Sequence, residues 1–183
     1  MKEGKMKTDI KSLVLTTVLW SLATQTALAA NIDLKSARGT VLIAAPTAVG
    51  GPTNQGIWFL NPSNKAYSLE LPELPSNQVY EGWIVDARTG KKVSSGIFRA
   101  KGGIDSDAAG KFSGPLSLNF PQVPGSDFVT LGENLVDGGH NVVITIEPYP
   151  DTDLNPSGVV VLRANIPENT TVGTEITLEN VAN

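Results

Sequence analysis

Cysteine is absent from the 183-residue chain, and histidine occurs once, at His140. Without cysteine the chain has no disulfides, thiolate zinc sites, iron–sulfur clusters or cysteine nucleophiles, and a single imidazole excludes any site that needs two. Basic residues are also scarce, because 14 Lys and Arg stand against 18 Asp and Glu, for a formal net charge of -4. A nucleic-acid-binding protein displaces counterions from phosphate with a basic surface, so this balance argues against that class.

The content of hydrophobic residues, glycine and proline is typical of a folded domain with many turns. Hydrophobic residues make up 40% of the chain and charged residues 17%, which is apolar enough for a packed core. The 18 glycines and 12 prolines favour many turns over long helices. The length suits a single domain.

The first 29 residues have the pattern of an export signal. A lysine-rich start precedes an apolar run at residues 13–23, and small residues follow at Ala27 and Ala29. The alternative is a membrane anchor, but polar Thr, Ser and Gln residues dilute the run, and a spanning helix needs about 20 mostly apolar residues. We therefore expect residues 1–29 to be a signal peptide, cleaved near Ala29, and residues 30–183 to form one exported domain, periplasmic or secreted, with no transmembrane segment.

Short strand-like runs recur along the rest of the chain, separated by Gly, Pro, Asn and Asp. This spacing predicts an all-β fold, an Ig-like or Greek-key β-sandwich of about 7–9 short antiparallel strands. The two most β-branched runs, 141–146 and 158–162, are expected in central positions, and the run 173–178 is expected to be a last edge strand. The remaining predicted strands are 40–44, 57–60, 66–71, 79–85, 93–98 and 112–120.

Four motifs between residues 57 and 163 carry a family resemblance. They are Leu71-Pro-Glu-Leu-Pro75 with Tyr80-Glu81-x-Trp83, Ser95-Gly-Ile-Phe98, Val143-Ile-Thr-Ile-Glu147-Pro148, and Pro156-x-Gly158-Val-Val-Val-Leu162. In order and approximate spacing they resemble the C-terminal, extracytoplasmic domain of anti-sigma-K factors. The resemblance implies a β-sandwich without known catalysis that senses or binds something outside the membrane, with Tyr80, Glu81, Trp83, Glu147, Pro148 and Gly158 as structural residues.

The chain also departs from that family. Only a dozen residues precede the hydrophobic run, so we expect a stand-alone exported domain without the sigma-binding module. The family's Gly-Gly-Ser turn after Glu-Pro is replaced by residues 149–155, and the stretch 121–140 is longer than in the family.

Two groups of acidic residues are candidates for chemistry. Glu81 and Glu147 are a potential carboxylate pair for hydrolysis, but carboxylates on apolar strand faces are usually retained when paired. We therefore expect backbone N–H groups or an arginine to hold each of them. Asp151, Asp153 and Asn155 have the alternating oxygen ligands with which a calcium loop begins, although the sixth and twelfth positions do not fit an EF-hand.

Other patterns have ordinary structural explanations. Trp58, Tyr80 and Trp83 lie in apolar runs and are expected in the core, not on a carbohydrate-stacking platform. His140 follows two glycines, in an expected turn, and no Gly-x-Ser-x-Gly elbow presents a serine for a triad. Asp105 and Asp107 form a second acidic turn.

Together these patterns favour an exported, non-enzymatic binding module without a cofactor. Its partner would be a protein or a component of the cell envelope. The alternatives are a calcium-binding structural module of the cell surface and, less favoured, a hydrolase that uses Glu81 and Glu147.

Overall fold

The structure is a computed structural model that describes residues 32–44, 53–64, 66–100, 128–129, 132–153, 155–156 and 158–182. Contacts divide the chain into Met1–Ile32 and Asp33–Asn183, and the fold below is that of the second unit. The predicted signal segment, the predicted strand 112–120 and the acidic turn at Asp105 lie outside the described residues. None of the described helices has the length and hydrophobicity needed to cross a membrane.

In the described part of the chain, nine antiparallel strands form one sheet in the order β5-β4-β7-β8-β9-β1-β2-β6, with β3 paired to β1 beside this path. The predicted all-β fold of about 7–9 short antiparallel strands is therefore confirmed. The strand bounds are β1 Arg38–Ile43, β2 Gly56–Trp58, β3 Leu69–Glu70, β4 Gln78–Asp86, β5 Lys92–Phe98, β6 Phe128–Val129, β7 His140–Pro148, β8 Val159–Asn165 and β9 Glu175–Asn180. Two 3-10 turns, Leu34–Ser36 and Thr53–Gln55, precede β1 and β2.

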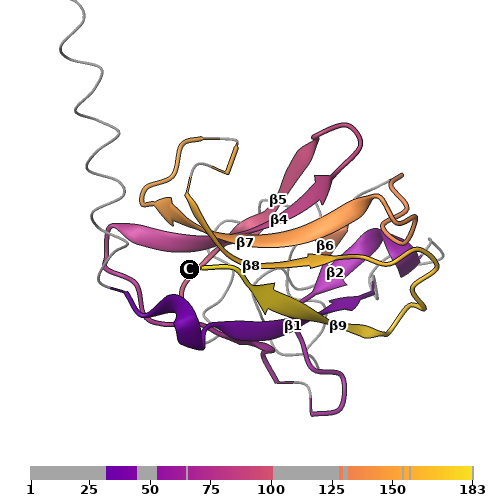
Figure 1. The fold of residues 1–183 in the computed structure, drawn as a ribbon, viewed down its shortest axis with the longest axis horizontal. Helices are drawn as coiled ribbons and strands as arrows, with labels where there is room; N and C mark the ends of the chain where they lie inside the picture. The colour runs from indigo at the N-terminus through magenta and orange to yellow at the C-terminus, as the bar shows by residue number, and fades with distance from the viewer. Residues whose placement is uncertain are drawn as a thin grey trace, which may run out of the picture. The chain divides into compact units, whose positions relative to one another are not determined.

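The sheet curls into a half-barrel, so that its two halves pack on each other as the layers of the core (Figure 1). Phe98 of β5 and Phe59, which follows β2, belong to opposite ends of the strand order, yet their ring centroids are 6.3 Å apart. Both rings are almost completely buried. Burial of such aromatic side chains is the main favourable term in folding.

The β-branched runs occupy the central positions that their composition predicts. β7 lies between β4 and β8, and β8 lies between β7 and β9. The prediction of an edge position for residues 173–178 is wrong, because β9 lies between β8 and β1. Its partner β1 comes from the other end of the domain, and local alternation of polar and apolar residues carries no information about such a distant partner.

Register assigns the side chains of β4 and β7 to two faces. Glu81 is opposite Thr145, Trp83 is opposite Val143, and Val79 is opposite Glu147, so these residues share one face because directly paired residues point the same way. We call this side of β4 and β7 the outer face. The other face carries Tyr80 and Gly82, and it is directed at Phe59 and Phe98.

Gly82 leaves room for a neighbouring side chain. A Cβ there would lie 2.1 Å from the Ser95 hydroxyl oxygen and 3.5 Å from the Phe59 ring. A glycine inside a strand often marks the close approach of another backbone, but here the space is filled by the Ser95 and Phe59 side chains. The register of β4 and β5 shifts beside it, between Gly82 and Trp83.

Candidate functional site

The two carboxylates singled out from the sequence lie on the same face of the sheet. Glu81 on β4 and Glu147 on β7 both belong to the outer face, and their exposed fractions are 5% and 0%. Ionised carboxylates are almost never buried this deeply without hydrogen-bond donors or opposite charges. The surroundings of Glu81 therefore decide what the pair can do.

A third carboxylate comes from the loop that joins β7 to β8, which we call the acidic loop (residues 149–158). The Tyr149 amide donates to the carbonyl of Asn77 at 2.9 Å, and the side chain of Asp151 is hydrogen-bonded to that of Glu81. At the far end, Gly158 packs so closely on β7 that a Cβ would lie 1.4 Å from the carbonyl oxygen of Ile146. The described residues of this loop thus bring Asp151 to Glu81 on the outer face.

Glu81 has one donor in the sheet. The Ser94 hydroxyl donates to its Oε1, and Ser94 in turn accepts from the amide of Gly96 at 3.1 Å. The expectation that backbone N–H groups or an arginine hold Glu81 is therefore wrong. Arg88 pairs with Asp86 and Asp137, Arg163 pairs with Glu179, and Arg99 donates to backbone carbonyls.

The other oxygen of Glu81 faces a carboxylate. Glu81 Oε2 and Asp151 Oδ2 are both buried, and among the described residues neither has a hydrogen-bond donor. Burial, the hydrogen bond to Asp151, and the charges of Asp151 and Glu147 raise the pKa of Glu81 to about 8, against the lowering effect of the Ser94 bond. Near neutral pH Glu81 is therefore protonated and can donate its proton to Asp151.

The acidic loop's own carboxylates also stabilise its backbone. Asp151 Oδ1 accepts from the amide of Asp153 at 2.9 Å, and Asp153 Oδ1 accepts from the amide of Asn155 at 3.0 Å. These are Asx turns, in which the carboxylate replaces a backbone acceptor. Within the ranges that the structure describes, no group of three or more His, Asp or Glu residues is placed to hold a metal ion.

The aromatic residues of the Tyr80–Trp83 motif are in the core, as predicted. Trp83 is 1% exposed, and its indole Nε1 donates to Thr145 Oγ1 at 2.9 Å. The Tyr80 hydroxyl donates to the carbonyl of Pro72 at 2.7 Å. This bond joins the two segments of the first motif, Leu71–Pro75 and Tyr80–Trp83. Trp58 is also buried, at 2% exposure.

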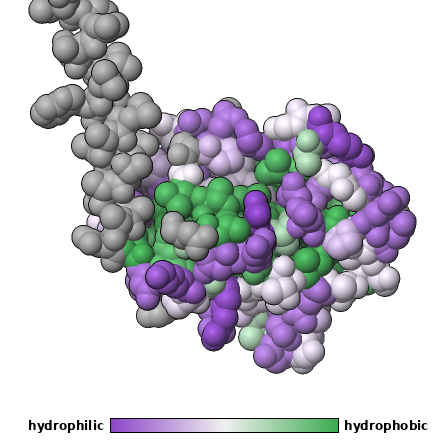
Figure 2. All heavy atoms as spheres, viewed as in Figure 1, coloured by the Kyte–Doolittle hydropathy of each residue, from purple (hydrophilic) through white to green (hydrophobic). Residues whose placement is uncertain are grey.

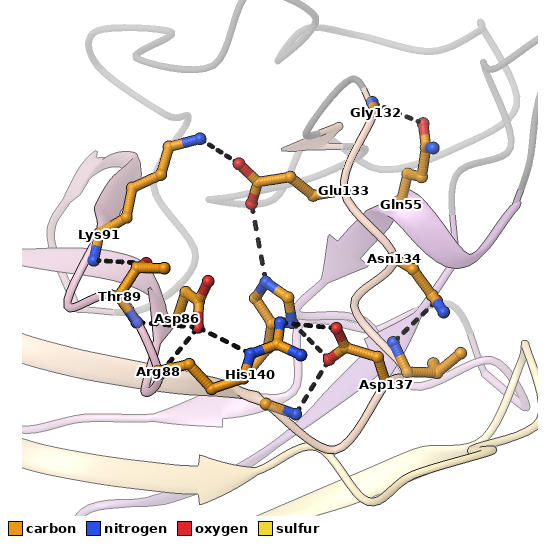
Figure 3. A network of polar contacts seen from close by, with 12 residues as sticks. Gln55, Asp86, Arg88, Thr89, Lys91, Gly132, Glu133, Asn134, Asp137 and His140 are labelled. Carbon is orange, nitrogen blue, oxygen red and sulfur yellow. Dashed lines mark hydrogen bonds and ion pairs between the residues drawn. The ribbon is translucent and has the colours of Figure 1, made fainter.

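His140 belongs to a separate polar network (Figure 3). It is buried and is the first residue of β7, so it lies in a strand and not in the expected turn. Its Nδ1 lies 2.9 Å from Asp137 Oδ1, and its Nε2 lies 3.7 Å from Glu133 Oε2. Because both ring nitrogens face carboxylates, His140 is not placed to activate a serine.

The same network ties the β4–β5 turn to residues 132–139. Arg88 binds Asp137 at 2.7 Å, and Lys91 pairs with Glu133 (Figure 3). Hydrogen bonds from the Gly139 amide, His140 and Arg88 lower the pKa of Asp137 to about 2. Sequence reasoning missed Glu133 and Asp137 because they lie in an irregular stretch without periodicity.

Exposed apolar side chains flank the acidic loop at both ends. Tyr149 begins the loop and is 48% exposed, while Val159 and Val160 follow it and are 40% and 37% exposed. β7 and β8 pair antiparallel at this point, with Ile146 opposite Val159 and Thr145 opposite Val160, so the two valines project from opposite faces of the exposed first residues of β8. We call these three residues the apolar surface. Figure 2 shows hydrophobic side chains gathered over the adjoining parts of β7 and β8.

Comparisons of the chain with protein-family models, with curated proteins and with solved structures gave no match. The resemblance to the anti-sigma-K domain therefore rests on the four motifs. Residues of the first, third and fourth motifs contact one another: the Trp83 indole donates to Thr145, and Gly158 packs against Ile146 beside Glu147.

Proposed function

We propose that this chain is an exported, non-enzymatic binding module that resembles the extracytoplasmic domain of anti-sigma-K factors and acts in envelope regulation. It binds a protein or envelope component through the apolar surface of Tyr149, Val159 and Val160. The observation that carries the proposal is the contrast at this end of the fold. The carboxylates suited to catalysis are buried between sheet and loop, while the large apolar side chains beside them face solvent.

The burial of Glu81 argues against the hydrolase alternative. A glycosidase needs both carboxyl groups open to a substrate bond between them, whereas Glu81 is hydrogen-bonded to Asp151 and Ser94. Two hollows of about 400 and 340 Å³ lie elsewhere, around the Arg38–Glu70 pair and around Arg163 and Thr177.

Exposed apolar groups near a loop are a common basis of recognition. Loops on a rigid sheet frequently carry binding residues, and clustered exposed apolar side chains mark interaction sites. An aromatic anchor strengthens the argument, because Tyr149 is held under the Arg99 guanidinium, 5.2 Å from the ring centroid.

Val160→Lys is expected to reduce capture of the partner by about tenfold or more, because a charge would have to be desolvated where an apolar group was buried. The matched control is Val172→Lys, since Val172 is 38% exposed but lies in the β8–β9 connection. The measurement is quantitative cross-linking of the tagged protein in its own envelope fraction, with thermal melts to confirm that both variants fold. Equal losses in the two variants, or none in either, would exclude this surface.

A further inference from the structure

We infer that Glu81 and Asp151 share a proton that fastens the acidic loop to the outer face, and that loss of this proton frees the loop. This inference rests on the proposed function in one respect only: Tyr149 of the apolar surface belongs to the loop and Val159 follows it directly, so release of the loop would alter binding.

The geometry of the two carboxyl groups requires a proton between them. Their side chains interact, and two carboxylates have no hydrogen to share unless one of them is protonated. Glu81 Oε2 and Asp151 Oδ2 are both buried, and no group in the described part of the chain donates a hydrogen bond to either. Two carboxylates in contact cannot both be ionised at small cost, so one of them holds a proton. Glu81 is the more deeply buried of the two and is the natural holder.

The groups around the pair oppose ionisation of Glu81. Among the described residues, Asp151 faces it from the acidic loop and Glu147 from β7, and both are acidic. β5 contributes the neutral Ser94 hydroxyl. Arg99, the cation that contacts Tyr149, donates instead to the carbonyls of Ser76 and Gln78. Ionised Glu81 would therefore meet two acidic neighbours and only one hydroxyl donor.

Ionisation of Glu81 should free only the centre of the acidic loop, because the start of the loop is held by a bond that does not depend on pH. Its start is held by the backbone bond from Tyr149 to Asn77. Its centre is held to the sheet by the Glu81–Asp151 bond, which becomes repulsive when the proton leaves. The pKa of Glu81, near 8, places this release at mildly alkaline pH. Opening should therefore loosen the Asx turns in which the amides of Asp153 and Asn155 are hydrogen-bonded, while the sheet stays intact.

Amide hydrogen exchange of the acidic loop tests the inference directly. After correction for the intrinsic rate at each pH, protection of Asp153 and Asn155 is expected to fall about tenfold between roughly pH 7 and pH 9 in the wild-type protein. In Glu81→Gln protection should stay constant, because the carboxamide keeps a donor for Asp151 and cannot ionise. Glu179→Gln, a change at an exposed ion pair on β9, is the matched control and should behave as wild type.

A second variant, Asp151→Asn, tests the inference if the Glu81→Gln protein does not fold. In Asp151→Asn the carboxamide can donate to ionised Glu81, so the fall near pH 8 should disappear. The inference is overturned if wild-type protection is constant with pH, or if Glu81→Gln shows the same fall. It is also overturned if about 1 mM calcium chloride restores protection at pH 9, since the cluster would then hold a cation. No partner is present in this assay, so its failure is independent of the cross-linking result.

Discussion

Trp83→Ala is expected to lower the free energy of unfolding by about 3–5 kcal/mol, the range for a large aromatic removed from a packed core. The indole is 1% exposed, and its N–H bonds Thr145, which is itself fully buried. The substitution leaves a cavity on the outer face and removes the donor to the Thr145 hydroxyl oxygen. Both effects destabilise the folded state.

Urea denaturation measures this change, and Trp83→Phe is the control. Phenylalanine keeps most of the ring volume but loses the N–H, so its cost should be on the order of 1 kcal/mol plus a small packing loss. An unchanged urea midpoint in Trp83→Ala, together with loss of partner binding, would show that Trp83 is a recognition residue and that its place in the core is wrong.

Gly158→Ala is expected to cost about 3 kcal/mol or more, at or beyond the usual range for overpacking. The added Cβ would meet the Ile146 carbonyl oxygen at 1.4 Å, and backbone cannot rotate away as a side chain can. The end of the acidic loop must then lift from β7. Glu147 Oε2 lies 3.2 Å from the same position, so the change also disturbs the carboxylate cluster.

Thermal unfolding compares this variant with Gly90→Ala. Gly90 has a φ of +73°, and an added methyl group there would have nothing within 4 Å, so alanine costs only the backbone strain, about 1 kcal/mol. If Gly158→Ala is no less stable than Gly90→Ala, the end of the acidic loop does not pack closely on β7.

Much of the sheet follows from local pattern. The alternating and β-branched runs at β4, β5 and β7 mark strands because they fit a pleated, half-buried surface, and the short turn between β4 and β5 makes a hairpin. The shared face of Glu81 and Glu147 cannot be predicted from local pattern alone. Alternation places each of them on one side of its own strand, but only the β4–β7 register brings the two sides together.

The third carboxylate was beyond sequence reasoning for a physical reason. Asp151 reaches Glu81 through the path of a loop, and loop paths are set by tertiary contacts such as Gly158 on β7. Its alternation with Asp153 resembles the start of a calcium loop, yet the same spacing produces consecutive Asx turns. The position of β9 was missed for a related reason, because its neighbour β1 is more than a hundred residues away.

The pH dependence of unfolding in wild type and Glu81→Gln is the most direct test of the buried carboxyl pair. The pKa of Glu81 is raised from 4.5 to about 8 in the folded state, so the folded protein binds the extra proton between these values. The stability that this proton contributes is present below pH 4.5 and is lost as the pH rises through 8. Asp86 and Asp137, whose pKa values are lowered to about 2, change stability only at more acidic pH.

Between pH 4.5 and pH 8, the wild-type protein should therefore lose on the order of 2 kcal/mol of unfolding free energy, a figure reduced for partial solvation. Glu81→Gln should lose much less. Parallel profiles for the two proteins, or wild-type stability that rises across the window, would contradict the shared proton.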